Sequence, residues 1–122
     1  MEEISRLYSI ENSPIGVLKM VKLSVYVPET HLEVVKRAMF NAGAGRIGSY
    51  EECSWQVLGL GQFKPTAGSR PFVGNVGDLS LLPEYQLEMV CQDELVNQVV
   101  RAMKRAHPYE EPAYAAWHIL NV

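Results

Sequence analysis

A histidine and two carboxylates stand close together near the C-terminal end of the sequence. Glu110 and Glu111 follow His107 by three and four residues in the run His-Pro-Tyr-Glu-Glu-Pro. Imidazole and carboxylate groups bind divalent metals, and a metal held by three protein ligands can activate water. A structural role is the alternative: His107 would bond the last carbonyls of a helix, while Pro108 and Pro112 shape the following turn. Both interpretations stay open at this stage.

Four further side chains are candidates for binding a ligand: Tyr50, Cys53, Lys64 and Tyr109. Tyr50 and Cys53 follow a glycine-rich turn and are expected to face a common cleft. Cys53 would need a lowered pKa and a nearby base to act as a nucleophile, so packing is its simpler role. Lys64 lies in a long connection, where it would contact an anionic ligand or remain a solvated charge. We predict no catalytic residue.

The glycine-rich turn at residues 43–48 does not match a nucleotide-binding loop. It lacks the preceding strand and following helix of a dinucleotide site, and it lacks the lysine of a P-loop. Its glycines are better explained by backbone conformations with positive φ.

The bulk properties restrict the class of protein. The length of 122 residues fits one domain, and a net charge of −3 with a pI near 5.6 argues against general binding to nucleic acid. We find no apolar run of about 18 residues, so we expect no membrane-spanning helix. Residues 1–19 lack the apolar stretch of a signal peptide and are expected to form a flexible or loosely docked extension. Without such a stretch we expect both cysteines to be reduced and the protein to be located in the cytoplasm.

The pattern predicts two similar halves in residues 20–122. In the first half, alternation predicts a strand over residues 21–27, and a helix follows with Thr30 opening a capping box and Gly43 after its C-cap. A second strand is expected over residues 53–60. In the second half a strand over residues 85–91 precedes a helix capped by Asp93, and a fourth strand covers residues 113–120. The glycine- and proline-rich residues 61–83 are expected to form a long connecting loop, with short hairpin pieces around residues 72–76.

This order predicts an α+β, ferredoxin-like βαββαβ fold, in which two helices cover one face of a four-stranded antiparallel sheet. The other face would expose Tyr26, Tyr114 and neighbouring apolar groups. An apolar patch of this kind is typically covered by another surface, and self-association is the simplest cover. Trp55 and Trp117 are expected to anchor the core or such an interface.

Three sequence stretches carry a family likeness: residues 41–54 (Asn-Ala-Gly-Ala-Gly-Arg-Ile-Gly-Ser-Tyr to Cys-Ser), residues 59–65 (Gly-Leu-Gly-Gln-Phe-Lys-Pro) with Pro-Phe-Val-Gly at 71–74, and residues 106–114 (Ala-His-Pro-Tyr-Glu-Glu-Pro-Ala-Tyr). Together they resemble the inserted middle domain of the YqfO-type Nif-three-like proteins, here in a stand-alone version. That domain is similar in fold to the trimeric CutA and PII proteins. The resemblance implies a trimer whose long connection occupies the place of the PII signalling loop.

The resemblance leaves three functions open. Full-length Nif-three-like proteins hold a dinuclear metal site in flanking domains that this sequence lacks, so their hydrolase activity does not transfer directly. We favour a non-catalytic, trimeric binding or regulatory module that binds a small molecule or a divalent metal ion. The alternatives are a metal-dependent hydrolase or a component of one, with His107, Glu110 and Glu111 as ligands, and a domain that docks on a separate protein.

Overall fold

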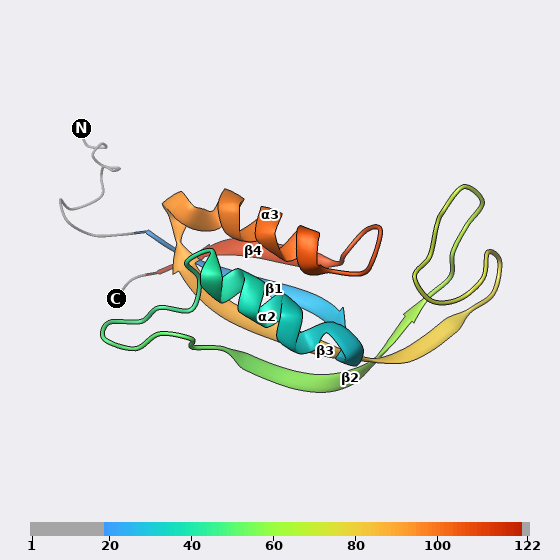
Figure 1. Cartoon of the computed structure of the whole chain (residues 1–122), viewed down its shortest axis with the longest axis horizontal. Helices are drawn as coiled ribbons and strands as arrows, with labels where there is room; N and C mark the ends of the chain where they lie inside the picture. Colours follow the sequence, from blue (N-terminus) through green and yellow to red (C-terminus); the bar gives the residue numbers. More distant parts are fainter. Residues whose placement is uncertain (1–18, 121–122) are drawn as a thin grey trace.

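The computed structural model describes residues 19–120, which form a four-stranded sheet with two helices packed on one face (Figure 1). The strands are β1 (Met20–Pro28), β2 (Trp55–Phe63), β3 (Ser80–Gln92) and β4 (Tyr114–Ile119). They lie in the order β2-β3-β1-β4, and every neighbouring pair is antiparallel. The predicted ferredoxin-like fold is therefore confirmed. The predicted N-terminal extension falls almost wholly on residues 1–18, which lie outside the described residues.

The two main helices are α2 (Leu32–Asn41) and α3 (Val96–Ala106), and each follows a short 3₁₀ turn, η1 (Glu29–His31) or η2 (Asp93–Leu95). Neither is long and apolar enough to cross a membrane, and the same holds for every other helix within residues 19–120. Their apolar stripes pack on β1 and β3. The buried side chains of this core are Val21, Leu23, Val25, Val27, Leu32, Val35, Met39, Phe40, Ala44, Leu87, Met89, Cys91, Val99 and Met103.

Both helix starts differ from the prediction. Thr30 does not cap α2, because it lies within η1, where its hydroxyl contacts His31 Nδ1 at 2.8 Å. Asp93 does not cap α3, because it lies within η2 and its carboxylate pairs with His118 Nε2 at 2.8 Å. In both halves a 3₁₀ turn tightens the entry to the helix and takes the place of a side-chain cap.

The end of α2 matches the prediction. Gly43 adopts φ +114°, and the amides of Gly43 and Ala44 donate to the carbonyls of Phe40 and Met39 at 3.0 and 3.1 Å. This is the Schellman arrangement, which requires a left-handed residue after the C-cap. The loop that follows is fastened to the sheet, because the Gly45 amide donates to the Val90 carbonyl at 2.7 Å.

The β2–β3 hairpin is longer than predicted. β2 continues to Phe63, which pairs with Ser80 of β3, so the connecting loop covers residues 64–79 and not 61–83. Residues 72–76 form bends and turns and no hairpin strand. Pro83 fits within β3 because β1 ends opposite Glu84, and beyond that point β3 has only β2 beside it. The tip of the hairpin therefore projects past the rest of the sheet (Figure 1).

The strand registers assign each side chain to one face of the sheet. Tyr114 pairs with the buried Val25, and Lys104 of α3 lies over its ring at 5.2 Å. Tyr114 therefore points to the helix side, and the prediction that it lies on the uncovered face is wrong. Trp117 pairs with Lys22 and occupies that face in its place.

Candidate functional site

The sheet face without helices, which we call the open face, carries large apolar side chains from three strands. Its exposed members, in the register that Tyr26 and Lys22 define, are Tyr26, Trp55, Val57, Trp117 and Ile119. Trp55 is 60% exposed and Trp117 is 43% exposed, so neither tryptophan belongs to the core of the isolated chain. A cluster of exposed aromatic and aliphatic side chains on one sheet is typical of an interaction surface.

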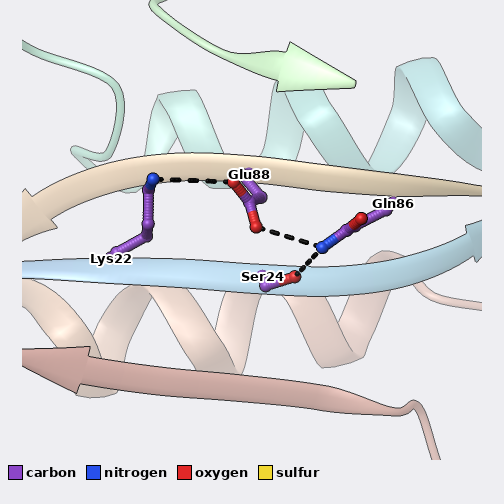
Figure 2. A network of polar contacts seen from close by, with 4 residues as sticks. All are labelled: Lys22, Ser24, Gln86 and Glu88. Carbon is purple, nitrogen blue, oxygen red and sulfur yellow. Dashed lines mark hydrogen bonds and ion pairs between the residues drawn. The ribbon is translucent and has the colours of Figure 1, made fainter. Parts of the chain in front are cut away.

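Polar side chains form a network across the middle of the open face (Figure 2). Gln86 Nε2 donates to Glu88 Oε2 at 3.1 Å and lies 3.4 Å from the Ser24 hydroxyl, while Lys22 Nζ stands 3.6 Å from Glu88 Oε1. The polar groups at the centre of the face therefore have partners on neighbouring strands. A second surface could cover this region without leaving these groups unpaired.

A tyrosine and a glutamate connect the turn after α3 to the projecting part of β3. The Tyr109 hydroxyl donates to Glu84 Oε2 at 2.6 Å. Burial, with a smaller contribution from Glu84, raises the pKa of Tyr109 well above its usual range, so the phenol stays protonated as the donor. Gly61 makes room for this pair, because a Cβ at that position would overlap the Glu84 carboxylate.

His107 fixes the same turn from the inside of the protein. The side chain is buried, and Nδ1 accepts a hydrogen bond from the Tyr109 amide at 3.1 Å. Nε2 must then carry the proton, which it donates to the Tyr26 carbonyl at 2.8 Å. Burial lowers the pKa of His107, so the neutral imidazole is favoured. Both ring nitrogens are thus used in holding the turn on β1.

A cavity of about 280 Å³ lies between the hairpin loop and this turn. Its apolar wall consists of Phe63, Pro65, Pro71, Phe72, Val73 and Tyr109, and its polar lining consists of Lys64, Thr66, Ser69, Glu110 and Glu111. The two sides are joined, because the Arg70 amide donates to Glu110 Oε1 at 2.9 Å. We call this space the hairpin cavity.

A second hollow of about 430 Å³ opens on the sheet side of Tyr109, and it shares Phe63, Tyr109 and Glu111 with the hairpin cavity. Tyr26, Val57, Glu84 and Gln86 also line it. Tyr109 therefore borders both spaces, one at the hairpin and one on the open face.

The structure brings together only some of the predicted site residues. Lys64, Tyr109, Glu110 and Glu111 all line the hairpin cavity. Tyr50 and Cys53 lie in the loop between α2 and β2, at the opposite end of the sheet (Figure 1). Tyr50 is 75% exposed and pairs with Ile47 in a short bridge. Cys53 is a free thiol beside Trp55 in a separate hollow.

The three predicted metal ligands do not converge within one chain. Among residues 19–120, no group of three or more His, Cys, Asp and Glu side chains is placed to hold a metal ion. His107 is buried and bonded at both nitrogens, whereas Glu110 and Glu111 are exposed. Within a single chain these residues therefore do not fit a metal centre. A site to which another copy of the chain contributes ligands stays a prediction.

The sequence interpretation missed Glu84, Phe63 and Phe72 as parts of the site. One signal was available, since Gly59 and Gly61 alternate within a strand that they weaken by propensity. A glycine inside a strand often marks the close approach of another group, and here the group above Gly61 is the Glu84 carboxylate.

Solved structures of similar fold define the class of protein. The periplasmic divalent cation tolerance protein CutA of Archaeoglobus fulgidus matches with a TM-score of 0.61 at 14% identity, over 84% of this chain and 86% of its own. GlnK of Bacillus subtilis matches with a TM-score of 0.51 at 17% identity, over 83% and 85% of the two chains. These likenesses show that the chain has the ferredoxin-like fold of these proteins.

More similar sequences identify the family. A Bacillus cereus protein related to NIF3 matches with a TM-score of 0.76 at 34% identity, over 98% of this chain and 32% of its own. The GTP cyclohydrolase 1 type 2 homolog of Halalkalibacterium halodurans is 41% identical over 109 residues, and that of Bacillus subtilis is 48% identical over 93 residues. The chain is therefore homologous to one part of these Nif-three-like, YqfO-type proteins.

The chain matches only a part of these relatives. The alignments cover 89% and 76% of this chain but 29% and 25% of the two cyclohydrolase homologs. No protein-family model matches the chain. That the matched part is the inserted middle domain, with residues 20–122 as one unit, stays a prediction.

Proposed function

We propose that this chain is a non-catalytic binding module that assembles with copies of itself through the open face. The observation that carries the proposal is the exposure of Trp55 and Trp117 on a sheet face whose central polar groups are already paired. The partner is a second and a third copy, because the resemblance to CutA and PII proteins implies a trimer. The two free thiols suit a reducing compartment, and the proposal places the module in the cytoplasm.

The make-up of the open face supports burial in an assembly. Tryptophan and tyrosine are enriched at the centres of protein interfaces, where their large rings are buried away from solvent. Here Tyr26, Trp55 and Trp117 come from β1, β2 and β4, so the aromatic groups extend over the width of the sheet. The Lys22–Glu88 pair lies among them and would set the register between copies by its fixed position.

The hairpin cavity supports a binding role for the module. Pockets that bind small molecules are mostly apolar and contain a few polar groups that fix the orientation of the ligand. The hairpin cavity has this character, and its two walls come from parts of the chain that Arg70 and Glu110 join. The proposal is a small-molecule or divalent-metal ligand whose binding alters the hairpin and thereby signals to other proteins.

Native mass spectrometry tests the assembly and the ligand together. The untagged chain is expected to appear as a trimer, and Trp117→Arg is expected to shift it to the monomer, since the substitution would bury a charge in the interface. Val34→Arg is the matched control, because Val34 is 51% exposed on α2, away from the open face. A wild-type monomer, or a trimer that tolerates Trp117→Arg, would contradict the assembly.

A mass adduct provides the second readout. An adduct that survives gentle desalting and disappears from the spectrum of a Phe72→Ala variant would support ligand binding in the hairpin cavity. A chelator applied before the measurement separates a metal ion from an organic molecule. An adduct that Phe72→Ala leaves unchanged would place binding elsewhere and contradict this part of the proposal.

A further inference from the structure

We propose that the hairpin cavity binds a small organic cation, with an alkylammonium group seated among Phe63, Phe72 and Tyr109. This inference rests on the proposed binding function and names the chemical class of its ligand.

Three aromatic rings border the cavity from two directions. The Tyr109 ring neighbours both Phe63 and Phe72, with centroid distances of 6.2 and 6.3 Å and interplanar angles of 54° and 48°. The rings are tilted and not stacked face to face, and all three line the space. A cation within about 6 Å of such faces is attracted by the negative charge of the π systems.

The hydrogen bond to Glu84 makes the Tyr109 ring more attractive to a cation. Its hydroxyl donates to the Glu84 carboxylate at 2.6 Å, and a hydrogen bond of this kind moves electron density from the O–H bond into the ring. The bond therefore increases the negative charge on the faces of the ring. The ring is also fixed in place, because its hydroxyl is bonded to Glu84 and the backbone behind it is bonded to His107. A fixed ring loses little conformational freedom when a ligand binds.

The charges of the lining favour a cation over an anion. Glu110 and Glu111 each bring a carboxylate, and Lys64 is the one basic side chain among the described residues that line the cavity. The Arg70 amide holds Glu110 at the cavity, at 2.9 Å from Oε1. Of the two roles predicted for Lys64, contact with an anionic ligand and a solvated charge, this proposal adopts the second, because the lining has an excess of negative charge.

The walls also favour an organic cation over a metal ion. Hard divalent cations bind to several oxygen atoms at once, whereas more than half of this lining is apolar, and among residues 19–120 no three His, Cys, Asp or Glu side chains are placed to hold a metal ion. An alkylammonium group instead buries methyl or methylene groups against the rings. The volume of about 280 Å³ lies just below the range of roughly 300–1,000 Å³ that is common for drug-sized ligands, so the ligand is small.

The test measures the binding of tetramethylammonium to the full chain by NMR. The resonances of Phe63, Phe72 and Tyr109 are followed in a ¹H–¹³C aromatic spectrum, with inorganic phosphate and Mg²⁺ as the competing anion and metal probes. We expect saturable shifts of these rings with tetramethylammonium alone. Saturable shifts with phosphate or Mg²⁺ and none with tetramethylammonium would overturn the proposal.

Three variants identify the physical cause of binding. Phe72→Leu keeps an apolar side chain but removes the π face, and it is expected to weaken binding by about threefold or more. Lys64→Gln removes the positive charge and is expected to strengthen it. Val76→Ala, in the same loop but outside the cavity lining, should leave the affinity unchanged. Equal affinity for wild type and Phe72→Leu would overturn the role of the ring.

The result separates this inference from the proposed function. Binding of phosphate in the hairpin cavity by an intact trimer would overturn the cationic ligand and leave the binding module in place. A chain that binds none of the probes and remains a monomer would contradict both the cationic ligand and the proposed binding module. Phe72 is 50% exposed in a loop, so its substitution does not threaten the fold.

Discussion

The Tyr109 hydroxyl lies 2.6 Å from Glu84 Oε2, and this bond joins the turn after α3 to the strand that carries the projecting hairpin. Both residues line the hollow on the open face, and Tyr109 also lines the hairpin cavity. A structural change in the hairpin cavity would therefore alter the hollow on the open face, and the reverse, through this one hydrogen bond. The pair connects the proposed ligand site to the proposed assembly surface.

Removal of the Tyr109 hydroxyl should lower stability moderately. Hydrogen bonds to charged groups contribute about 1.5–3 kcal/mol, and because Glu84 is only half-buried we expect Tyr109→Phe to cost about 1 kcal/mol of unfolding free energy. Urea unfolding measures this cost. Glu84→Gln keeps an acceptor for the hydroxyl and should cost less. A larger loss for Glu84→Gln than for Tyr109→Phe would contradict this account of the pair.

Gly61→Ala should break the same bond from the other strand. A Cβ at Gly61 would displace the Glu84 carboxylate, whereas a Cβ at Gly59 would meet only the Glu84 carbonyl oxygen, at 3.9 Å. In a double-mutant cycle, Tyr109→Phe should therefore cost almost nothing in the Gly61→Ala background. In the Gly59→Ala background it should keep its full cost. Additive effects in both backgrounds would show that Gly61 has no role in placing Glu84.

Protonation of His107 should destabilise the fold in mildly acidic solution. Burial puts the pKa of His107 below its ordinary value of 6.5, so below that pH the unfolded chain binds more protons at this residue than the folded chain. The contribution of neutral His107 to the free energy of unfolding is fully present above about pH 6.5. It is lost as the pH falls toward the lower pKa of the folded state. Protonated Nδ1 can no longer accept from the Tyr109 amide.

Two histidine variants isolate this effect. His107→Gln should cost about 2 kcal/mol at pH 8, because buried backbone groups lose a partner, but its stability should change less between pH 8 and pH 5.5 than that of the wild type. His31→Gln, at a partly exposed position, should keep most of the wild-type pH dependence. Urea unfolding at the two pH values measures both. An equal pH dependence in wild type and His107→Gln would contradict the assignment.

Local sequence was enough to predict the elements of the first half. The alternation of β1, the stripe of α2 and the glycine after its C-cap all depend on neighbours within one turn or one strand. Sequence was not enough to predict the helix starts, because Thr30 and Asp93 suit a cap but the chain forms a 3₁₀ turn at both places. The Asp93 carboxylate instead pairs with His118, which is distant in sequence.

The parts of the site that sequence missed depend on pairing between distant strands. β4 carries an aromatic residue on each face, Tyr114 and Trp117, so alternation alone could not show which face is covered. Only the pairing of Tyr114 with Val25 settles it. Likewise Glu84 became part of the site because β3 extends past β1, and Pro83 and Gly61 suggested a loop there. The ring of Tyr109 was predicted, but not its partner.

The Lys22–Glu88 pair distinguishes an isolated sheet from an assembled one. Nζ lies 3.6 Å from Oε1, and the two side chains are 39% and 18% exposed in the single chain. An ion pair this exposed to solvent contributes about 0–1 kcal/mol to the free energy of unfolding, so Lys22→Met should change the stability of a dilute monomer very little. If another copy covers the open face, the same change leaves Glu88 buried without its cation. The cost then rises to about 3–5 kcal/mol.

The expected result is therefore a stability loss that grows with protein concentration. Chemical unfolding and native mass spectrometry over a dilution series should show Lys22→Met dissociating at concentrations where the wild type is assembled. Lys36→Met is the matched control, because Lys36 pairs with Glu33 within α2 at 3.0 Å, away from the open face. A small loss of equal size in both variants at every concentration would mean that Glu88 stays in contact with water, and that the open face is not the surface through which the chain assembles.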